Sequence, residues 1–229
     1  MTRVLRVNVG CGPLPIPGWE NLDNSPSVAI ARLPRWCTSL LERVRLIRPE
    51  QARVVDVARA GAIRRGRAEK LPFADGAAAV VYSSHMLEHL GRDEAKLFLH
   101  ECHRVLHAGG ILRLVVPDLE RYVRAYVQDG DANQLIDGLH MAQSGGNESI
   151  VRRLFVGFRG HRWMYDGLSL KTLVEEAGFE NVELLPPGKT GLDDPAGLDL
   201  REREEDSLYL EARRGAASPT PGAAEVDNR

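Results

Sequence analysis

Short apolar runs recur along the chain, and stretches with a helical period separate many of them. The runs typical of β strands are 4–9, 19–23, 53–57, 79–83, 111–116, 181–185 and 207–213, with 62–66 as an alternative third strand. Helical periodicity covers 38–48, 92–106, 119–128, 132–142 and 168–177. Strands that alternate with helices favour a parallel sheet. The pattern therefore predicts an α/β fold with a doubly wound, mostly parallel seven-stranded sheet.

The two ends of this predicted sheet differ from its centre. The last two strands are separated by the Pro-, Gly- and Asp-rich segment 186–199, so we expect them to form an antiparallel edge hairpin. Near the start, only about ten residues separate Gly12 from Asp23, whereas a parallel crossover needs a dozen or more. Pro13, Pro15 and Pro17 fall within this interval. Because proline disfavours helix interiors, we expect the first helix to be reduced to a turn.

The length of 229 residues suits one domain with one sizeable core. We expect a single domain over 1–213, with a helical lid insert at about 119–166. Residues 214–229 are rich in Ala, Pro, Ser and Gly and offer little to bury, which predicts a disordered tail.

Charge and composition exclude several kinds of partner. The net charge is −2, so the sequence gives no broad basic footprint for nucleic acid. No apolar stretch approaches the ~18 residues of a membrane span, and the first residues lack the apolar core of a signal peptide. The three cysteines are odd in number and form no Cys-x-x-Cys pair. We therefore expect no membrane partner and a reducing, cytoplasmic location.

Two glycines one residue apart follow the first predicted strand, in the run Val9-Gly10-Cys11-Gly12. Glycine has no Cβ, so the backbone can turn tightly there and lie against a ligand. At the carboxyl end of the first strand of an open α/β sheet, that ligand is typically nucleotide-like. The glycine pair alone is also compatible with a tight loop that has no ligand.

Three further motifs lie in register with the glycine pair, and the four together are a specific signal. Asp23 closes the second strand, 68–73 reads Ala-Glu-Lys-Leu-Pro-Phe, and Gly109-Gly110 precedes the apolar strand 111–116. With the glycine pair, these motifs resemble the class I S-adenosylmethionine-dependent methyltransferases over roughly 4–211. The resemblance implies S-adenosylmethionine as cofactor, with the ribose on Asp23 and the adenine beside Ala68 and Glu69. The contacts that it implies are Asn8, Gly10, Cys11, Gly12, Asp23, Ala68, Glu69 and Ser83.

The sequence departs from the family pattern at three positions. Asn8 stands where the family usually has an acid, Leu14 where it has a third glycine, and Arg67 where it has the adenine-binding acid. These departures leave open a cofactor-binding module that has lost catalysis.

The run His85-x-x-Glu88-His89 follows the fourth strand, beside the expected methyl donor. Positions i, i+3 and i+4 of a helix share one face, so the three side chains predict a site for Mg²⁺ or another divalent metal. The run is similar to the Glu-x-x-Glu-His metal pattern of ubiquinone-biosynthesis O-methyltransferases. The alternatives are a structural turn and the inverted zinc-protease motif. Asp118 is a candidate extra ligand, or the cap of the helix that follows it.

The candidate catalytic groups are His85, Glu88, Asp118, His140 and His161. Transfer to a hydroxyl needs a base or a metal ion, and histidine suits the role of base at neutral pH. Tyr122, Tyr126 and Trp163 in the insert offer flat apolar faces of the kind that bind sugars. The alternative for these aromatic residues is that they pack the insert.

Residues 160–183 resemble small methyltransferases of polysaccharide synthesis, such as the methylmannose-polysaccharide O-methyltransferases. We therefore predict transfer of a methyl group to a saccharide hydroxyl of an oligo- or polysaccharide precursor. Phenolic or quinone metabolites and amines stay open as acceptors. The expected partners are this acceptor, as a small molecule or oligosaccharide, and a second copy of the chain in a homodimer.

Overall fold

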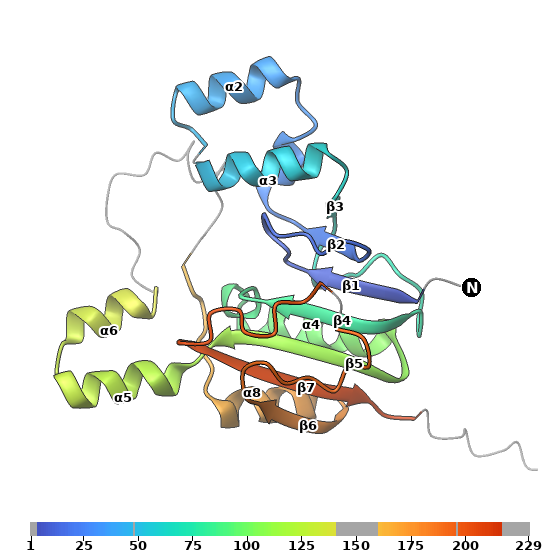
Figure 1. Cartoon of the computed structure of the whole chain (residues 1–229), viewed down its shortest axis with the longest axis vertical. Coiled ribbons are helices and arrows are strands. Elements are labelled where there is room, and N and C mark those ends of the chain that lie inside the picture. The colour runs from blue at the N-terminus through green and yellow to red at the C-terminus, as the bar shows by residue number, and fades with distance from the viewer. Residues whose placement is uncertain (1–3, 48, 141–159, 196, 217–229) are drawn as a thin grey trace, which may run out of the picture.

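The computed structural model describes residues 4–47, 49–140, 160–195 and 197–216. Its centre is one sheet of seven strands in the order β3-β2-β1-β4-β5-β7-β6 (Figure 1). The strands are β1 Leu5–Val9, β2 Glu20–Asp23, β3 Arg64–Arg65, β4 Ala78–Ser84, β5 Leu106–Pro117, β6 Phe179–Leu185 and β7 Ser207–Arg214. Strands β1 to β5 pair in parallel, and β7 pairs antiparallel with both β5 and β6. The predicted α/β fold with its antiparallel edge hairpin is confirmed.

Eight helical segments are described around this sheet. They are α1 Pro26–Ile30, α2 Arg35–Arg43, α3 Pro49–Arg59, the 3₁₀ turn η1 Leu87–His89, α4 Arg92–Val105, α5 Leu119–Asp129, α6 Ala132–Gly138 and α8 Gly167–Glu176. Each of the five predicted helices has a counterpart within a few residues of its expected bounds.

The strand predicted over 53–57 is wrong, because these residues belong to helix α3. Gln51, Val54 and Val55 are the buried residues of this helix, and their spacing of three and four is helical. Apolar residues in the run Arg-Val-Val-Asp-Val satisfy a strand pattern and a helical face equally well. The third strand is instead the short β3, within the alternative range 62–66.

The connection between β1 and β2 contains no helix, as the prolines predict. The side chain of Asn21 holds this turn in place. Its Oδ1 accepts a hydrogen bond from Ile16 N at 2.8 Å, and its Nδ2 donates to the Ile16 carbonyl at 3.0 Å. A loop therefore covers the sheet where a first helix would otherwise lie.

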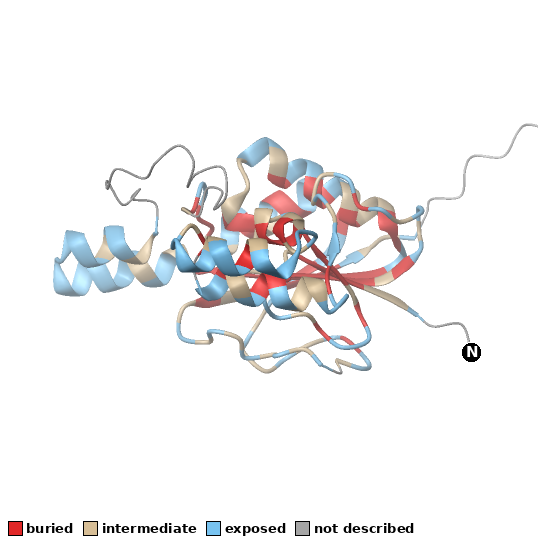
Figure 2. Ribbon diagram, turned by 90° about the horizontal axis from the view of Figure 1, so that it is seen from above, coloured by how far each residue is buried: buried red, intermediate tan, exposed pale blue. Residues whose placement is uncertain are grey.

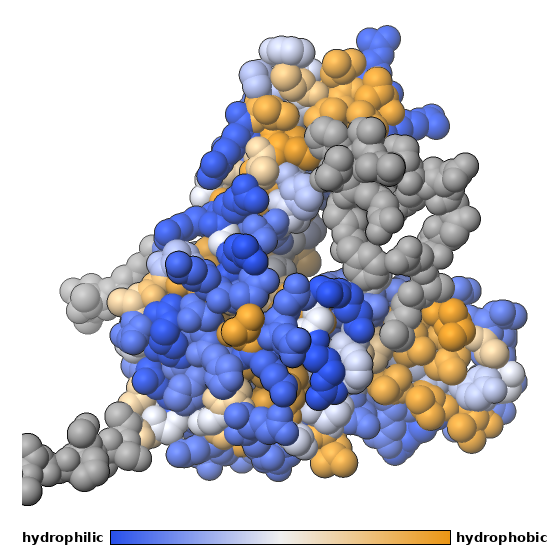
Figure 3. All heavy atoms as spheres, turned by 180° about the vertical axis from the view of Figure 1, so that it is seen from behind, coloured by the Kyte–Doolittle hydropathy of each residue, from blue (hydrophilic) through white to orange (hydrophobic). Residues whose placement is uncertain are grey.

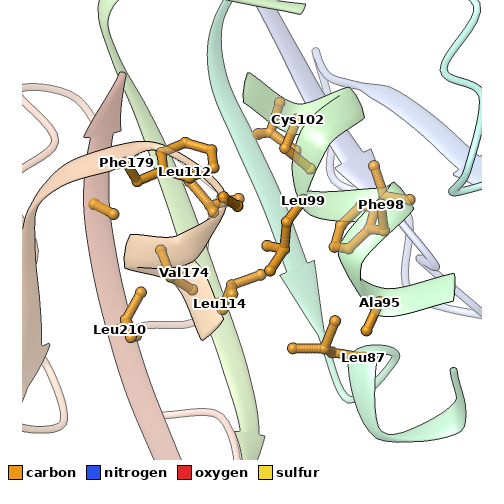
Figure 4. Close-up of a cluster of buried hydrophobic side chains, with 14 of the residues drawn as sticks. Leu87, Ala95, Phe98, Leu99, Cys102, Leu112, Leu114, Val174, Phe179 and Leu210 are labelled. Carbon is orange, nitrogen blue, oxygen red and sulfur yellow. The ribbon is translucent and has the colours of Figure 1, made fainter. Parts of the chain in front are cut away.

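The two faces of the sheet are covered differently. Helices α4 and α8 pack on one face, against Leu112 and Leu114 of β5 and Leu210 of β7 (Figure 4). The other face has a smaller apolar cluster that includes loop residues before β2 and after β6. Its members are Ile16, Trp19, Val80, Tyr82, Ile111, Val115, Leu192 and Tyr209. Alternate residues of β4 and β5 serve the two clusters, as the period of a strand requires.

Buried residues are concentrated along the sheet, whereas α5 and α6 extend away from it and are largely exposed (Figure 2). Apolar residues are exposed on α5 and α6 and also on α2 (Figure 3). Residues 141–159 of the expected lid insert, and most of the expected tail, lie outside the described residues. The domain limits of 1–213 and 119–166 therefore stay predictions. Among the described residues, no helix is long and apolar enough to cross a membrane.

Candidate functional site

The glycine loop after β1 is fixed by hydrogen bonds to β2. Gly10 N and Cys11 N both donate to the carbonyl of Leu22, at 2.8 and 3.1 Å. Gly10 has a φ of +75°, and a Cβ built on it would lie 2.3 Å from Met86 Cγ. Both its backbone conformation and its contact with Met86 therefore require glycine at this position.

Asp23 ties the end of β2 to the same loop. Its Oδ2 accepts from Gly12 N at 3.0 Å, and its Oδ1 accepts from Ser25 N at 2.6 Å. A carboxylate has about four acceptor positions, so two of them stay available for a ligand hydroxyl. Asp23 thus stabilises the turn after β2 and is also placed for the predicted ribose contact.

A cavity of about 250 Å³ opens beside this carboxylate. Its lining brings together four of the predicted cofactor residues with part of the segment after β4. The lining residues are Val9, Gly10, Asp23, Asn24, Ser25, Gly66, Ala68, Glu69, Met86, His89 and Leu90. Glu69 also accepts from Arg67 Nε at 3.3 Å, so the acid and the basic residue that departs from the family pattern form an ion pair.

A second cavity, of about 520 Å³, shares Gly10 with the first. It lies on the loop-covered face and is lined by Asn8, Gly10, Cys11, Pro13, Leu14, Pro15, Ile16, Tyr82, Ser84, Gly197, Asp199 and Glu202. Glu202 Oε2 accepts from the hydroxyls of Tyr82 and Ser84, at 2.9 and 2.8 Å. Burial raises the pKa of the Cys11 thiol to about 12, so this residue stays a neutral thiol.

Three of the predicted cofactor residues have other positions or partners. Asn8 lines the second cavity, but its Nδ2 donates to Asn21 Oδ1 at 3.0 Å. Ser83 is buried and its hydroxyl donates to the Val9 carbonyl at 3.0 Å. Gly12 and Ser83 line neither of these two cavities. Asn8 and Ser83 therefore hold strands β1, β2 and β4 together.

The run 85–89 does not form the continuous helix on which its metal prediction rests. Only the single turn η1 is helical, and His85 precedes it with a φ of +47°. His85 Nε2 lies 3.1 Å from Ser207 Oγ, and Arg203 Nη1 lies 3.4 Å from His85 Nδ1. Both ring nitrogens of His85 therefore have partners on or beside β7, although Nδ1 is also 3.5 Å from Glu88 Oε1. The expected sharing of one helical face is wrong.

Besides His85, Glu88 has two further histidines around it: His89, and His161, which is distant in sequence. Oε1 of Glu88 lies 4.0 Å from Nε2 of each of these two. Burial, the largest cause, lowers the pKa of His161 to about 4, so its ring is neutral at pH 7. A neutral ring with so low a pKa is a weak proton acceptor but an available ligand. The ring of His140 lies 5.3 Å from that of His161, between centroids.

Asp118 has the structural role that the alternative reading gave it. Its Oδ1 accepts from Glu120 N at 3.0 Å and so caps helix α5, and Arg121 Nε lies 3.5 Å from its other oxygen. Burial raises the pKa of the Asp118 carboxyl above its ordinary value. Among the described residues, the group with metal-ligand spacing contains neither Asp118 nor His85.

The three predicted substrate aromatics have different surroundings. The Tyr122 hydroxyl donates to Asp206 Oδ2 at 3.3 Å, and its ring lies against Gly138, the last residue of α6. Tyr126 is exposed on α5. Trp163 is 38% exposed and follows His161 by two residues, with the Arg92 guanidinium 4.6 Å from its ring centroid. Trp163 is thus the aromatic residue of the three that lies beside the Glu88 cluster.

Sequence reasoning missed several residues of these cavities. Met86 lines the first cavity, and Asp199 and Glu202 line the second; His89, which was predicted as a metal ligand, also lines the first. No local pattern marks the two acids, because they lie in an irregular connection. The one available signal was the position of 86–89 directly after a central strand, where ligands of α/β proteins gather.

Comparisons with known proteins agree with this geometry. Residues 36–114 match the family model described as a methyltransferase domain. An S-adenosylmethionine-dependent methyltransferase of Methanosarcina mazei is similar, with 15% identity, a TM-score of 0.52 and coverage of 95% of each chain. Another, from Thermotoga maritima, has 16% identity and a TM-score of 0.50, with 93% of this chain and 83% of that chain covered. A search of curated proteins gives no match.

At these identities the structural likeness establishes the fold. The methyltransferase-domain model covers residues 36–114, about a third of the chain, and indicates methyltransferase chemistry for this fold.

Proposed function

We propose that S-adenosylmethionine binds across Gly10, with its two ends in the two cavities that meet there. The adenosine part fits the cavity of Asp23, Ala68 and Glu69, where a carboxylate with free acceptor positions serves the ribose hydroxyls. The amino acid end fits the second cavity, where Asp199 and Glu202 complement its ammonium group. Met86 packs against Gly10 at the junction, near the expected sulfonium.

We propose that the acceptor is a saccharide hydroxyl. The observation that supports this most is the group of imidazoles beside the cofactor cavity, with His89 in the cavity lining and His161 behind it. A sugar hydroxyl is too weakly acidic to ionise at pH 7, so its methylation needs a base or a metal ion at this place. The exposed ring of Trp163 beside His161 supplies a flat apolar surface suited to a sugar ring.

We propose a role for each of these residues on the basis of its position. Gly10 and Asp23 hold the cofactor, and the imidazoles around Glu88 face the acceptor hydroxyl. His140 is exposed near His161 and is the imidazole best placed to pass a proton to solvent. His85 positions the segment after β4 through Ser207. Asp118 caps α5 and takes no part in the chemistry.

A methyl-transfer assay with labelled S-adenosylmethionine tests the acceptor class. Mannosides, other oligosaccharides, phenols and amines are offered in parallel, and NMR assigns the methylated atom. We expect incorporation into a saccharide oxygen, reduced at least tenfold in Trp163→Ala because the sugar loses its stacking surface. Incorporation only into phenols or amines would contradict the saccharide proposal.

A further inference from the structure

Glu88 is a buried carboxylate without a hydrogen-bond partner among the described residues. Its side chain is 1% exposed, and both Oε1 and Oε2 lack a partner. A buried charge in this condition is costly, and native proteins pair such groups with an ion, a donor or a metal. Within the described part of the chain, both carboxylate oxygens of Glu88 are therefore available to a ligand.

Two of the three histidines around Glu88, His89 and His161, are oriented as ligands. His89 Nδ1 lies 3.2 Å from the Gly160 carbonyl, and His161 Nδ1 lies 3.2 Å from Met164 Sδ. In each ring the other nitrogen, Nε2, is left facing Glu88. Metal-bound histidines commonly use one nitrogen for the metal and the other for a backbone or side-chain acceptor.

The chain holds these three side chains together through the backbone. Arg162 N and Trp163 N both donate to the Glu88 carbonyl, at 2.8 and 3.2 Å. These bonds fix the segment that contains His161 directly over η1. The three ligand atoms lie within 4.8 Å of one another. Small side-chain movements would bring each of them to the roughly 2.0–2.2 Å typical of metal bonds to imidazole and carboxylate.

We propose that Glu88, His89 and His161 bind a divalent transition-metal ion, Zn²⁺ or one of similar preference. Two imidazoles and one carboxylate are a donor set that suits zinc and other transition metals, whereas Mg²⁺ prefers oxygen ligands. Three protein ligands leave at least one coordination position open, which is typical of catalytic rather than structural sites. His161 thus takes the place that sequence spacing gave to His85, and a transition metal takes the place of Mg²⁺.

The position of this site suggests its use. His89 is a ligand and also lines the Gly10 and Asp23 cavity, so the open coordination position lies at the edge of the cofactor site. When bound there, the ion would lower the pKa of an acceptor hydroxyl and orient its oxygen. This use rests on the proposed hydroxyl methylation, whereas metal binding itself does not.

The test is metal binding by the full-length protein without a polyhistidine tag. The protein is stripped with chelator, titrated with Zn²⁺ and Co²⁺, and assayed by metal analysis after gel filtration and by the visible absorption of bound Co²⁺. We expect one ion per chain. Glu88→Gln and His161→Ala should each weaken metal binding at least tenfold, because losing a residue that only supports a metal ligand already has an effect of that size.

Two matched controls separate the alternatives. His100→Ala removes an exposed histidine of α4 and should leave binding unchanged. His85→Ala should weaken binding less than His161→Ala, because His85 positions the segment that carries Glu88 and His89 but supplies no ligand. Circular dichroism confirms that each variant is folded, and His161→Gln replaces any His161→Ala protein that is not.

Three results would overturn the proposal. They are the absence of stoichiometric Zn²⁺ or Co²⁺ binding, equal binding by folded Glu88→Gln, and loss of binding in His85→Ala with retention in His161→Ala. Because these measurements need neither cofactor nor acceptor, they are independent of the saccharide assay.

Discussion

Single residues determine the shape of the proposed cofactor site, and Gly10 is the residue that tolerates substitution least. Its positive φ lets the loop turn, and the missing Cβ leaves room for Met86. The glycine pair was recognisable in the sequence, but the contact with Met86 was not, since a contact between segments distant along the chain leaves no local pattern. The same holds for Glu88 and His161, which only the tertiary fold brings together.

Gly10→Ala should weaken cofactor binding at least tenfold and destabilise the fold. The new Cβ would collide with Met86, and a left-handed backbone costs a non-glycine residue about 1–2 kcal/mol. Gly12→Ala is the matched control, because it also has a positive φ but no atom within 4 Å of its Cβ. Calorimetry and thermal melting of both variants measure the difference. Equal losses in the two would show that Met86 does not matter.

Asp23→Ala should weaken S-adenosylhomocysteine binding by about 1–3 kcal/mol, the cost of leaving polar hydroxyls without an acceptor. It should also lower the melting temperature, because Gly12 N and Ser25 N lose their acceptor. The measurement is calorimetric titration of the folded variant. Unchanged affinity would place the ribose elsewhere.

At the scale of elements, the pairing of β5 with β7 buries a charged pair. Arg113 on β5 is fully buried, and its Nη1 lies 2.6 Å from Glu211 Oε1 on β7. Nothing in the sequence pattern predicted this buried pair. The error at 53–57 belongs to the same scale, because a short apolar run fits a strand and a helical face alike.

Glu211→Ala should lower the free energy of unfolding by about 3–5 kcal/mol, since it leaves the buried Arg113 charge uncompensated. Arg113→Met combined with Glu211→Leu should be less destabilised than the single variant. Urea denaturation measures all three proteins. A double variant less stable than Glu211→Ala would show that the pair itself is favourable.

The end of α4 should contribute acid-sensitive stability. Hydrogen bonds from Arg104, followed by weaker effects, hold the pKa of Glu101 below its ordinary value. On acidification the unfolded chain therefore binds this proton first, so stability is present above the ordinary glutamate pKa and is lost as the pH falls through the lowered one. In Glu101→Gln the melting temperature should depend less on pH between pH 6 and 3 than in the unmodified protein. Glu175→Gln, on the exposed surface of α8, should leave this pH dependence unchanged.

For the whole molecule, the mostly parallel seven-stranded sheet and its edge hairpin followed from the sequence pattern, because strand and helix periods are local properties. The sequence predicted only in part that loops instead of helices cover one face of the sheet. The prolines after Gly12 predicted the missing helix, but the loop before β7 that carries Asp199 and Glu202 gave no signal. This loop completes the second cavity, in which we propose that the amino acid end of the methyl donor binds.

The central claim is that this chain binds S-adenosylmethionine at the two cavities that meet at Gly10. Titration calorimetry of the full-length protein with S-adenosylhomocysteine tests it most directly, since the product analogue binds without reacting. We predict saturable binding of one molecule per chain, with Gly10→Ala at least tenfold weaker. Absence of binding at high micromolar concentration, or unchanged binding by folded Gly10→Ala, would contradict the account.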